Sequence, residues 1–359
     1  EVNMHLGIVR LKYTPFGGAE RIIQRLVSAL GSHGRVSKIT IFSSHWESNK
    51  EARGNVDVDV DVDVVKIEPK GVGRFWRQRN FFNAARQAIN AIKTLDIVQS
   101  HERMVGSDIF RTGDGVHAAW LDRLSRDRDW LGRQLLQADP FHRLICANEA
   151  KIASDARTVF VANSPLAKME IERCLGVPEG RIWLIPNGID AEHWRNVPRD
   201  PISRTIARGR LGLDPNNPCI LFVGSGFQRK GLRELILGVA LMKNVQLLVV
   251  GKDSKASRYH ELAEQKALGR VRFAGPLKSV EDAITAADVF CLPSLYDSFS
   301  NAALEALGAG LPVVVSKDTG LSSYIDNYGG GLVCERDPES IRESLELALN
   351  RAGTLAAEA

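Results

Sequence analysis

The sequence lacks the marks of several protein classes. Its five cysteines lie apart in apolar surroundings without a Cys-x-x-Cys pair, and its eight histidines show no metal-ligand spacing. We therefore expect free thiols in a reducing compartment and no structural zinc. No apolar run is long enough to span a bilayer, and no signal peptide opens the chain. A net charge of +4 is too small by itself to indicate a nucleic-acid partner.

Two common nucleotide-binding motifs are also absent. The three-glycine fingerprint of dinucleotide-binding folds does not occur, which argues against a nicotinamide enzyme. The glycine-containing loop at 224–231 lacks the terminal Gly-Lys-Ser/Thr of the P-loop, so ATP hydrolysis is not supported.

Strand patterns alternate with helix patterns along the whole chain. This alternation predicts parallel sheets, and 359 residues favour two α/β domains over one. The polar, proline-containing stretch at 196–203 is the natural linker, so we place an N-terminal domain at 1–197 and a C-terminal domain at 198–359. The expected strands are 5–11, 38–42, 96–99, 108–111, 158–162, 181–185, 219–223, 245–250, 271–274, 289–292 and 312–315.

An alternating Asp-Val ladder covers residues 56–64. Alternate residues of a strand point to the same side, so the four aspartates of this ladder would share one solvated face. The ladder is best interpreted as an exposed edge or hairpin strand, and a calcium site is the less favoured alternative.

The most informative segment is 292–315. An apolar run ends at Pro293, a polar loop follows, and a helix pattern with apolar residues on one face ends at two glycines before a second buried strand. A helix N-terminus offers unpaired N–H groups and partial positive charge, which suits a phosphate or sugar hydroxyls. Asp297 and Glu305 add carboxylates at the mouth of this helix and about one turn inside it. This combination points to a neutral, hydroxyl-rich group held beside a phosphate.

Two further loops follow predicted strands. Gly17 and Gly18 separate the first strand from the first helix, where a missing side chain lets a phosphate or sugar approach the main chain; a tight turn without a ligand is the alternative. Arg229 and Lys230 follow the strand at 219–223, and two cations there can neutralise a departing diphosphate. A solvated basic turn is the alternative.

A carboxylate and an imidazole lie close together after the strand at 108–111. Asp114 and His117 could handle the proton of an acceptor hydroxyl or stabilise positive charge on a donor sugar. The alternatives are a helix N-cap for Asp114 and an ordinary surface histidine for His117. The His101-Glu102 pair, after the preceding strand, gives a weaker signal of the same kind.

Four motifs in this order resemble those of a known family. They are 15–21, 184–190, 222–232 and 292–315, and together they resemble the retaining GT-B glycosyltransferases of family 4 and group 1, especially lipopolysaccharide core glucosyltransferases. The resemblance runs along nearly the whole chain. In the family's signature two glutamates flank seven residues; here the first is Asp297, shorter by one methylene, and the second is Glu305.

The resemblance implies two Rossmann-like domains facing across a cleft, with the acceptor on the N-terminal domain and the nucleotide sugar on the C-terminal one. Glu305 would accept hydrogen bonds from the ribose hydroxyls, Asp297 would hold the donor sugar, and the base would lie near Gly275–Leu277. The catalytic candidates are Asp114, Arg229, Lys230, Asp297 and Glu305. The donor-binding candidates are Gly17, Gly18, Gly224, Ser225, Gly275, Leu277, Phe299, Ser300, Asn301 and Ala302. The candidates for acceptor or proton handling are His117 and Glu20.

The implied reaction is transfer of a sugar from a nucleotide sugar, UDP-glucose or a similar hexose donor, to a saccharide or glycolipid. Lipopolysaccharide core or another cell-surface glycan is the implied acceptor. The resemblance also implies retention of anomeric configuration, no metal and no cofactor beyond the donor. A sugar-nucleotide epimerase of the same fold is the rival enzyme, and a non-catalytic sugar-nucleotide binder is the rival outside enzymes. We expect a cytoplasmic monomer without a nucleic-acid partner.

Basic and aromatic residues combine at 74–82 and at 120–133. Such helices can lie on an anionic bilayer, so the cytoplasmic face of the inner membrane is a candidate partner; a core helix with a solvated face is the alternative. Acidic residues interleave with the basic ones, which makes nucleic acid a poorer choice. Family members usually end with a helix that crosses back to the first domain, and 340–357 would be its beginning.

Overall fold

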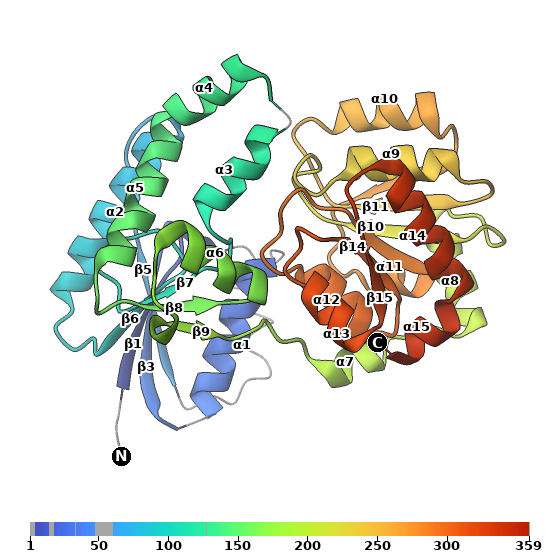
Figure 1. Cartoon of the computed structure of the whole chain (residues 1–359). Coiled ribbons are helices and arrows are strands. Elements are labelled where there is room, and N and C mark those ends of the chain that lie inside the picture. The colour runs from blue at the N-terminus through green and yellow to red at the C-terminus, as the bar shows by residue number, and fades with distance from the viewer. Residues whose placement is uncertain (1–3, 14–17, 33, 47–59, 127, 359) are drawn as a thin grey trace. The chain divides into compact units, whose positions relative to one another are not determined.

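The chain forms two compact units, residues 1–186 and 187–359, each built on its own parallel sheet (Figure 1). The computed structural model describes residues 4–13, 18–32, 34–46, 60–126 and 128–358. The division between the units falls 11 residues before the predicted end of the first domain at residue 197. The intervening segment contains the short helix α7 (Ala191–Arg195), which packs against helix α12 of unit 2. Trp194 of α7 is buried in the core of that unit.

Unit 1 has a seven-stranded sheet of order β5-β3-β1-β6-β7-β8-β9, in which all neighbouring strands are parallel. The chain moves outward from β1 to β5, and then returns to place β6 on the other side of β1. Its elements are β1 (Met4–Val9), β2 (Lys12–Tyr13), α1 (Gly18–Ser32), β3 (Val36–Ser43), β4 (His45–Trp46), β5 (Asp61–Lys66), α2 (Gly73–Ala91), β6 (Ile97–Ser100), β7 (Ile109–Arg111), α3 (His117–Arg126), α4 (Trp130–Ala138), α5 (Pro140–Ser154), β8 (Val159–Ala162), α6 (Pro165–Leu175) and β9 (Ile182–Leu184).

Strand β5 is the described part of the Asp-Val ladder. Among the described strands it pairs with β3 only, in parallel, so its edge position in the described sheet is confirmed and a hairpin with β3 is excluded. Lys38 of β3 lies 3.2 Å from Asp61 and 2.6 Å from Asp63, so a cation from the neighbouring strand already pairs with these aspartates. Residues 56–59 of the ladder lie outside the described residues.

Unit 2 has a six-stranded sheet of order β12-β11-β10-β13-β14-β15, again with parallel neighbours. Its elements after α7 are α8 (Pro201–Leu211), β10 (Cys219–Val223), α9 (Leu232–Leu241), β11 (Gln246–Val250), α10 (Ala256–Lys266), β12 (Val271–Gly275), α11 (Glu281–Ala286), β13 (Val289–Leu292), α12 (Asn301–Gly308), β14 (Val313–Ser316), α13 (Ser322–Tyr328), β15 (Gly331–Cys334), α14 (Pro338–Asn350) and α15 (Ala352–Glu358).

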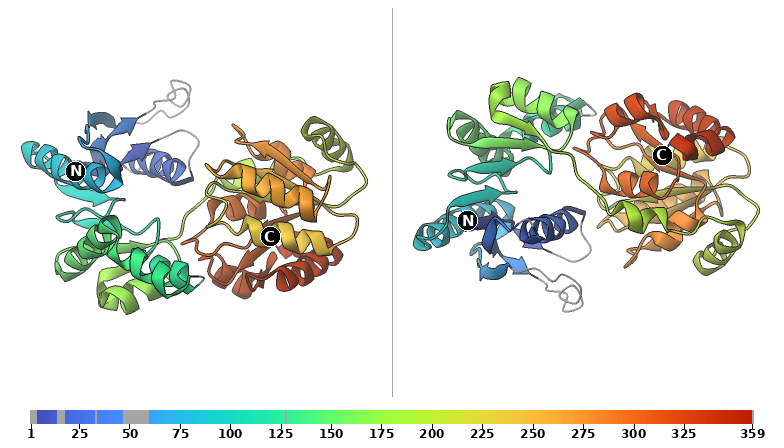
Figure 2. Two further views of the ribbon diagram at one scale, coloured as in Figure 1. Left: turned by 90° about the horizontal axis from the view of Figure 1, so that it is seen from above. Right: turned by 90° about the horizontal axis from the view of Figure 1, so that it is seen from below.

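Helices cover both faces of the sheet of unit 2 (Figures 1 and 2). The four inner strands, β11, β10, β13 and β14, are mainly apolar and largely buried, as expected of a parallel sheet covered on both sides. Helix α14 packs along α9, where a side chain on Gly238 would meet Ile341 at 3.0 Å. Both C-terminal helices therefore belong to unit 2, and Leu355 of α15 is part of its core.

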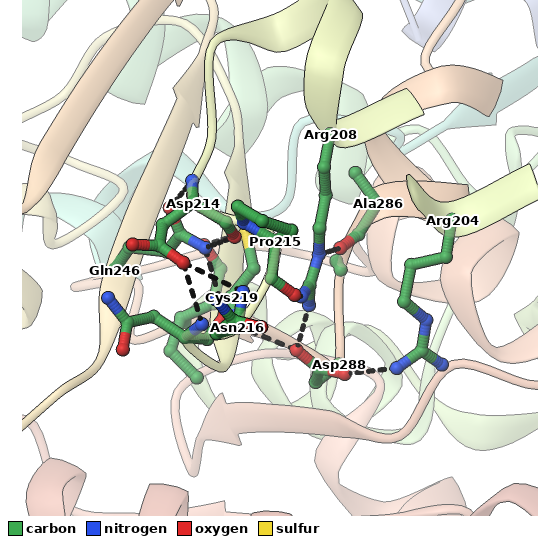
Figure 3. A network of polar contacts seen from close by, with 12 residues as sticks. Arg204, Arg208, Asp214, Pro215, Asn216, Cys219, Gln246, Ala286 and Asp288 are labelled. Atoms are coloured by element: carbon green, nitrogen blue, oxygen red, sulfur yellow. Dashed lines mark hydrogen bonds and ion pairs between the residues drawn. The ribbon is translucent and has the colours of Figure 1, made fainter. Parts of the chain in front are cut away.

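A polar network ties helix α8 to the amino ends of β10 and β13 (Figure 3). Asp288, directly before β13, accepts hydrogen bonds at 2.6 Å from both Arg204 and Arg208 and at 2.7 Å from the Cys219 N–H. Arg208 also donates to the carbonyl oxygens of Ala286 and Pro215. Asp288 thus forms ion pairs with both arginines, which offsets the cost of burying its carboxylate.

Within the described ranges, no helix is long and apolar enough to cross a bilayer.

Candidate active site

The carboxyl ends of β10 and β13 form the centre of the candidate site in unit 2. These two strands are neighbours, yet the chain leaves β10 toward β11 on one side and leaves β13 toward β14 on the other. Ligands of open α/β sheets bind where strand order reverses in this way, outside the carboxyl ends. The sequence-predicted motifs at 224–231 and 293–301 follow these two strands directly.

Backbone hydrogen bonds join the loops that follow β10 and β11. Gly224 N–H donates to the Val250 carbonyl at 2.9 Å, and Gly226 N–H donates to the Lys252 carbonyl at 3.2 Å. Gly251 has φ of 138°, and a Cβ there would lie 2.0 Å from the Gly224 carbonyl oxygen. Glycine is required for this close approach. Gly224 and Ser225 therefore lie in a loop whose backbone is fixed on one side.

Arg229 and Lys230 are held against the segment that follows β13. The Leu295 N–H donates to the Arg229 carbonyl at 2.8 Å, and Arg229 Nη1 donates to the Tyr296 carbonyl at 3.1 Å. Gly231 follows with φ of 75°, and a Cβ there would lie 1.9 Å from the Pro293 carbonyl oxygen. The two cations and the Asp297 loop are thus brought together.

Lys230 forms an ion pair with Asp297, and both side chains are largely buried. Burial alone would raise the pKa of Asp297, but the charges of Lys230 and Arg229, with hydrogen bonds from Lys230 and the Phe299 N–H, lower it overall. Asp297 is therefore ionised at neutral pH. The Asp297 carboxylate accepts a hydrogen bond from the N–H of Phe299, two residues later, and this bond stabilises the loop as in an Asx turn.

Helix α12 begins at the end of this loop. Ser300 is its N-cap, and its hydroxyl accepts from the Ala303 N–H at 3.4 Å. Ser300 also has φ of 78°, a left-handed conformation that is strained for a residue with a side chain and often occurs at functional sites. Asn301 Oδ1 accepts from Asn187 Nδ2 at 2.8 Å. Ala302 lies in the first turn, and Glu305 is buried one turn inside.

The proposed base region lies at the same edge of the sheet, two strands away from β10. Gly275 ends β12 with φ of 71°, and its carbonyl accepts from the Gly251 N–H at 2.9 Å. Leu277 packs against the core of unit 2. The structure therefore brings the loops after β10, β11, β12 and β13 to one edge of the sheet.

The first sheet carries a second polar cluster, also at a reversal of strand order. Arg10 follows β1 and Glu102 follows β6, the two strands between which the order reverses. Arg10 Nη1 lies 3.3 Å from Asp114 Oδ2 and 3.5 Å from Glu102 Oε1. Burial raises the pKa of Glu102, while Arg10 and the Leu11 N–H oppose this. Arg10 thus holds Asp114. The sequence analysis did not identify Arg10, although its position directly after strand β1 could have indicated it.

His117 is buried, so the alternative of an ordinary surface histidine is wrong. Its Nε2 lies 3.0 Å from His142 Nδ1, and its ring contacts Trp120 and Phe141 at centroid distances of 5.4 and 6.3 Å. Burial above all, then the charges of Arg103, His142 and Arg74, lower the pKa of His117 to about 3. A neutral, packed imidazole is a weak base, so the geometry favours a packing role.

Three predicted residues cannot be placed fully. Gly17 lies outside the described residues, and Gly18 is the first residue of α1. Glu20 belongs to α1, but its side chain is outside the described part of the chain.

In the described part of the chain, no group of three or more His, Cys, Asp or Glu side chains is arranged to hold a metal ion. The chemistry of the unit 2 site is that of cations, carboxylates and a helix N-terminus. Such groups bind phosphates and sugar hydroxyls.

The structure resembles solved glycosyltransferases along its whole length. It superposes on the crystal structure of WaaG, described as a glycosyltransferase involved in lipopolysaccharide biosynthesis, with a TM-score of 0.83, 23% identity and coverage of 98% of this chain and 93% of that one. It superposes on Anabaena Alr3699/HepE in complex with UDP-glucose with a TM-score of 0.71, 16% identity and coverage of 99% and 92%. At these identities the likeness shows the fold.

The sequence matches extend this to the family. Lipopolysaccharide glucosyltransferase WaaG of Escherichia coli (strain K12) is 24% identical over 351 residues, which cover 95% of this chain and 88% of the relative. The family model described as Glycosyltransferase Family 4 matches residues 16–193, and the model described as Glycosyl transferases group 1 matches residues 203–357. With both models in this order on two Rossmann-like α/β units, the chain belongs to the glycosyltransferases of family 4 and group 1 with the GT-B fold.

Proposed function

We propose that the protein transfers a hexose from a nucleoside diphosphate sugar, UDP-glucose or a close analogue, to a saccharide acceptor, with retention of anomeric configuration. The observation that carries this is the set of groups gathered at the β10/β13 edge of unit 2. It contains the Arg229-Lys230 pair, the Asp297 carboxylate and the N-terminus of α12 with the buried Glu305. The matching relatives that bear lipopolysaccharide names support a lipopolysaccharide-core acceptor.

The proposed reaction breaks the bond between the anomeric carbon and the diphosphate oxygen, and the diphosphate keeps the electron pair. Arg229 and Lys230 would stabilise its growing negative charge. Lys230 has three N–H donors, so it can contact a phosphate oxygen while it remains bonded to Asp297. The acceptor oxygen forms the new bond to the anomeric carbon on the face that the diphosphate leaves.

The acceptor hydroxyl loses its proton in this step. We assign hydrogen-bond acceptance from that hydroxyl to Asp114 on unit 1, whose carboxylate is half-exposed. The proton then goes to this carboxylate or to the departing diphosphate. The reaction needs no cofactor beyond the donor and, in this proposal, no metal ion.

The test combines binding and product analysis. Thermal shifts against UDP-, ADP- and GDP-sugars should show one preferred donor, because a ligand that binds the folded state raises its melting temperature. The preferred donor is then incubated with and without truncated lipopolysaccharide core oligosaccharide. Formation of an α-linked product from an α-linked donor, only with acceptor, supports the proposal. Conversion of donor without acceptor would indicate an epimerase, and binding without turnover a sugar-nucleotide binder.

We also propose that an anionic bilayer presents the acceptor, with α4 as the contact. Trp130, Leu131 and Leu135 of this helix are 74%, 57% and 64% exposed. The exposed residues Arg128 and Arg133 flank them. Exposed aromatic and apolar side chains next to arginines suit the interface of an anionic membrane.

Within the 74–82 stretch, the contacts of Arg74 argue against this residue as a membrane contact. Arg74 pairs with Asp139 and lies 4.7 Å above the Phe141 ring, so it joins α2 to the start of α5. Co-sedimentation with anionic vesicles should therefore fall when Trp130, Leu131 and Leu135 become Ser, and change little in Arg74→Ser, because the charge of Arg74 is already paired. Equal binding to neutral vesicles, or no binding to anionic ones, would reject membrane contact.

A further inference from the structure

The polar cluster of unit 1 contains a row of three charged residues, of which the proposed reaction uses only Asp114. It begins at Glu102 after β6, continues through Arg10 after β1 and ends at Asp114 after β7. Because the carboxyl ends of parallel strands meet at one edge of a sheet, residues far apart in sequence come together here.

The exposed fraction of the side chain increases from Glu102 through Arg10 to Asp114. The side chains of Glu102 and Arg10 are 12% and 15% exposed, whereas that of Asp114 is 51% exposed. Glu102 Oε1 is fixed by the Leu11 N–H at 3.0 Å, and the Glu102 backbone bonds in both directions with Ser100 Oγ. Among these three groups, Asp114 is therefore the one that a ligand can reach, and the other two lie behind it.

The backbone of the Asp114 loop is held on both sides. Asn163 Nδ2 donates to the Gly113 carbonyl at 3.2 Å, and Arg103 Nη2 donates to the Gly115 carbonyl at 2.8 Å. Arg103 is itself anchored by Glu149 at 2.8 Å, which also accepts from the His117 N–H. With the loop fixed, the direction of the Asp114 carboxylate depends on its side-chain partner.

We propose that Arg10, oriented by Glu102, is a positioning residue that keeps the Asp114 carboxylate aimed at the acceptor hydroxyl. This rests on the proposed function, because it assigns Asp114 to the acceptor. A carboxylate can rotate about its side-chain bonds, and an arginine on one oxygen limits that rotation. In this arrangement Arg10 orients the base Asp114, and Glu102 in turn holds Arg10.

A double-mutant cycle tests the proposal. Arg10→Gln, Asp114→Asn and the double variant are compared by kcat and KM for the acceptor at saturating donor. Each single variant should lower kcat/KM for the acceptor by about tenfold or more, and the double variant should be no worse than Asp114→Asn. Arg10→Lys should recover part of the loss, and the KM for the donor should stay near that of the wild type.

Arg181→Gln is the matched control. Arg181 is a part-buried arginine of unit 1 whose guanidinium bonds to the carbonyls of Ala153, Asp155 and Thr158. Its loss should lower the melting temperature and leave acceptor kinetics unchanged. If Arg10→Gln does not fold, Glu102→Gln replaces it in the same cycle.

Additive losses in the cycle, or an Arg10 effect on donor and acceptor alike, would overturn the positioning role. Full activity of Asp114→Asn would remove both the role of Asp114 and this inference. A wild-type protein that transfers no sugar would instead reject the proposed function itself.

Discussion

The two ends of the sheet of unit 2 each carry a largely buried aspartate side chain paired with cations, yet they differ in what surrounds the pair. At the amino end, Asp288 is 16% exposed and binds two arginines and a backbone N–H. At the carboxyl end, Asp297 is 11% exposed and pairs with Lys230. Burial and pairing are therefore alike at the two ends.

The backbone distinguishes them. Around Asp297 the chain adopts conformations that cost energy or require glycine, at Gly231, Gly251 and Ser300. Around Asp288 the ion pairs join a helix to two strands, and Arg208 also donates to two carbonyl oxygens. A buried ion pair alone is thus no sign of a site; its position at a strand's carboxyl end, among strained and glycine-dependent turns, is the better sign.

Replacing the aspartate by asparagine at each end of the sheet should affect different properties: mainly stability at the amino end and mainly activity at the carboxyl end. Asp288→Asn leaves Arg208 buried without its counter-charge and should cost about 3–5 kcal/mol of unfolding free energy. The folded fraction should keep a kcat/KM near that of the wild type. Asp297→Asn should lower kcat about 10²-fold or more, with a smaller loss of stability.

Chemical denaturation and steady-state kinetics on both variants measure this. Equal losses of activity and stability in the two variants would erase the distinction between the two ends of the sheet.

The cations give the next largest expected effect. Arg229→Ala and Lys230→Ala should each lower kcat about 10²-fold and raise the donor KM less, because charge on the leaving diphosphate grows as its bond breaks. Arg204→Ala, at the amino end, is the control and should change neither constant. An effect confined to KM would mean that the cations bind ground state and transition state equally well.

The sequence predicted the fold well because parallel strands are apolar runs. The predicted strands agree with the observed ones within two residues, for example 219–223 with β10 and 289–292 with β13. Strand β15 (Gly331–Cys334) was missed, because its short apolar run follows three glycines and resembles a turn. The domain boundary differed because the polar, proline-containing stretch at 196–203 was interpreted as the linker, whereas α7, which precedes it, already packs on α12 of unit 2.

The site was predictable where a motif follows a strand directly, and less so elsewhere. The sequence predicted that Arg229, Lys230 and Asp297 lie after strands, but the ion pair between Lys230 and Asp297 depends on the Gly231 turn. Arg10 was missed because a single arginine after a strand carries no pattern of its own. The burial of His117 depends on helix α5, which supplies Phe141 and His142.

Glu305 should give a smaller effect than the cations. Glu305→Gln should weaken donor binding by about 1.5–3 kcal/mol, since a carboxylate shared by two ribose hydroxyls loses its charge, and Glu305→Ala should do more. Donor Kd from calorimetry measures this. Variants within a factor of two of the wild type would remove Glu305 from the site.

Asp297→Glu tests the departure from the family's glutamate. The shorter carboxylate accepts from both Lys230 and the Phe299 N–H, and an added methylene would displace one of these contacts. We expect kcat to fall by about tenfold, a smaller loss than in Asp297→Asn because the charge is kept. A gain in activity would show that the loop tolerates either reach and that the Phe299 contact is dispensable.

Chelation should have the smallest effect of all. If Arg229 and Lys230 supply the positive charge that a divalent ion supplies in other transferases, then kcat with EDTA should match kcat with added Mg²⁺ or Mn²⁺. The Arg229→Ala variant sharpens the test, because a metal ion bound to the diphosphate could replace part of the lost charge there. Rescue of that variant by Mg²⁺, with no effect on the wild type, would assign the charge to the arginine. Complete loss of wild-type activity on chelation would instead show that the carboxyl end of the sheet, unlike the amino end, depends on an ion that its own cations do not replace.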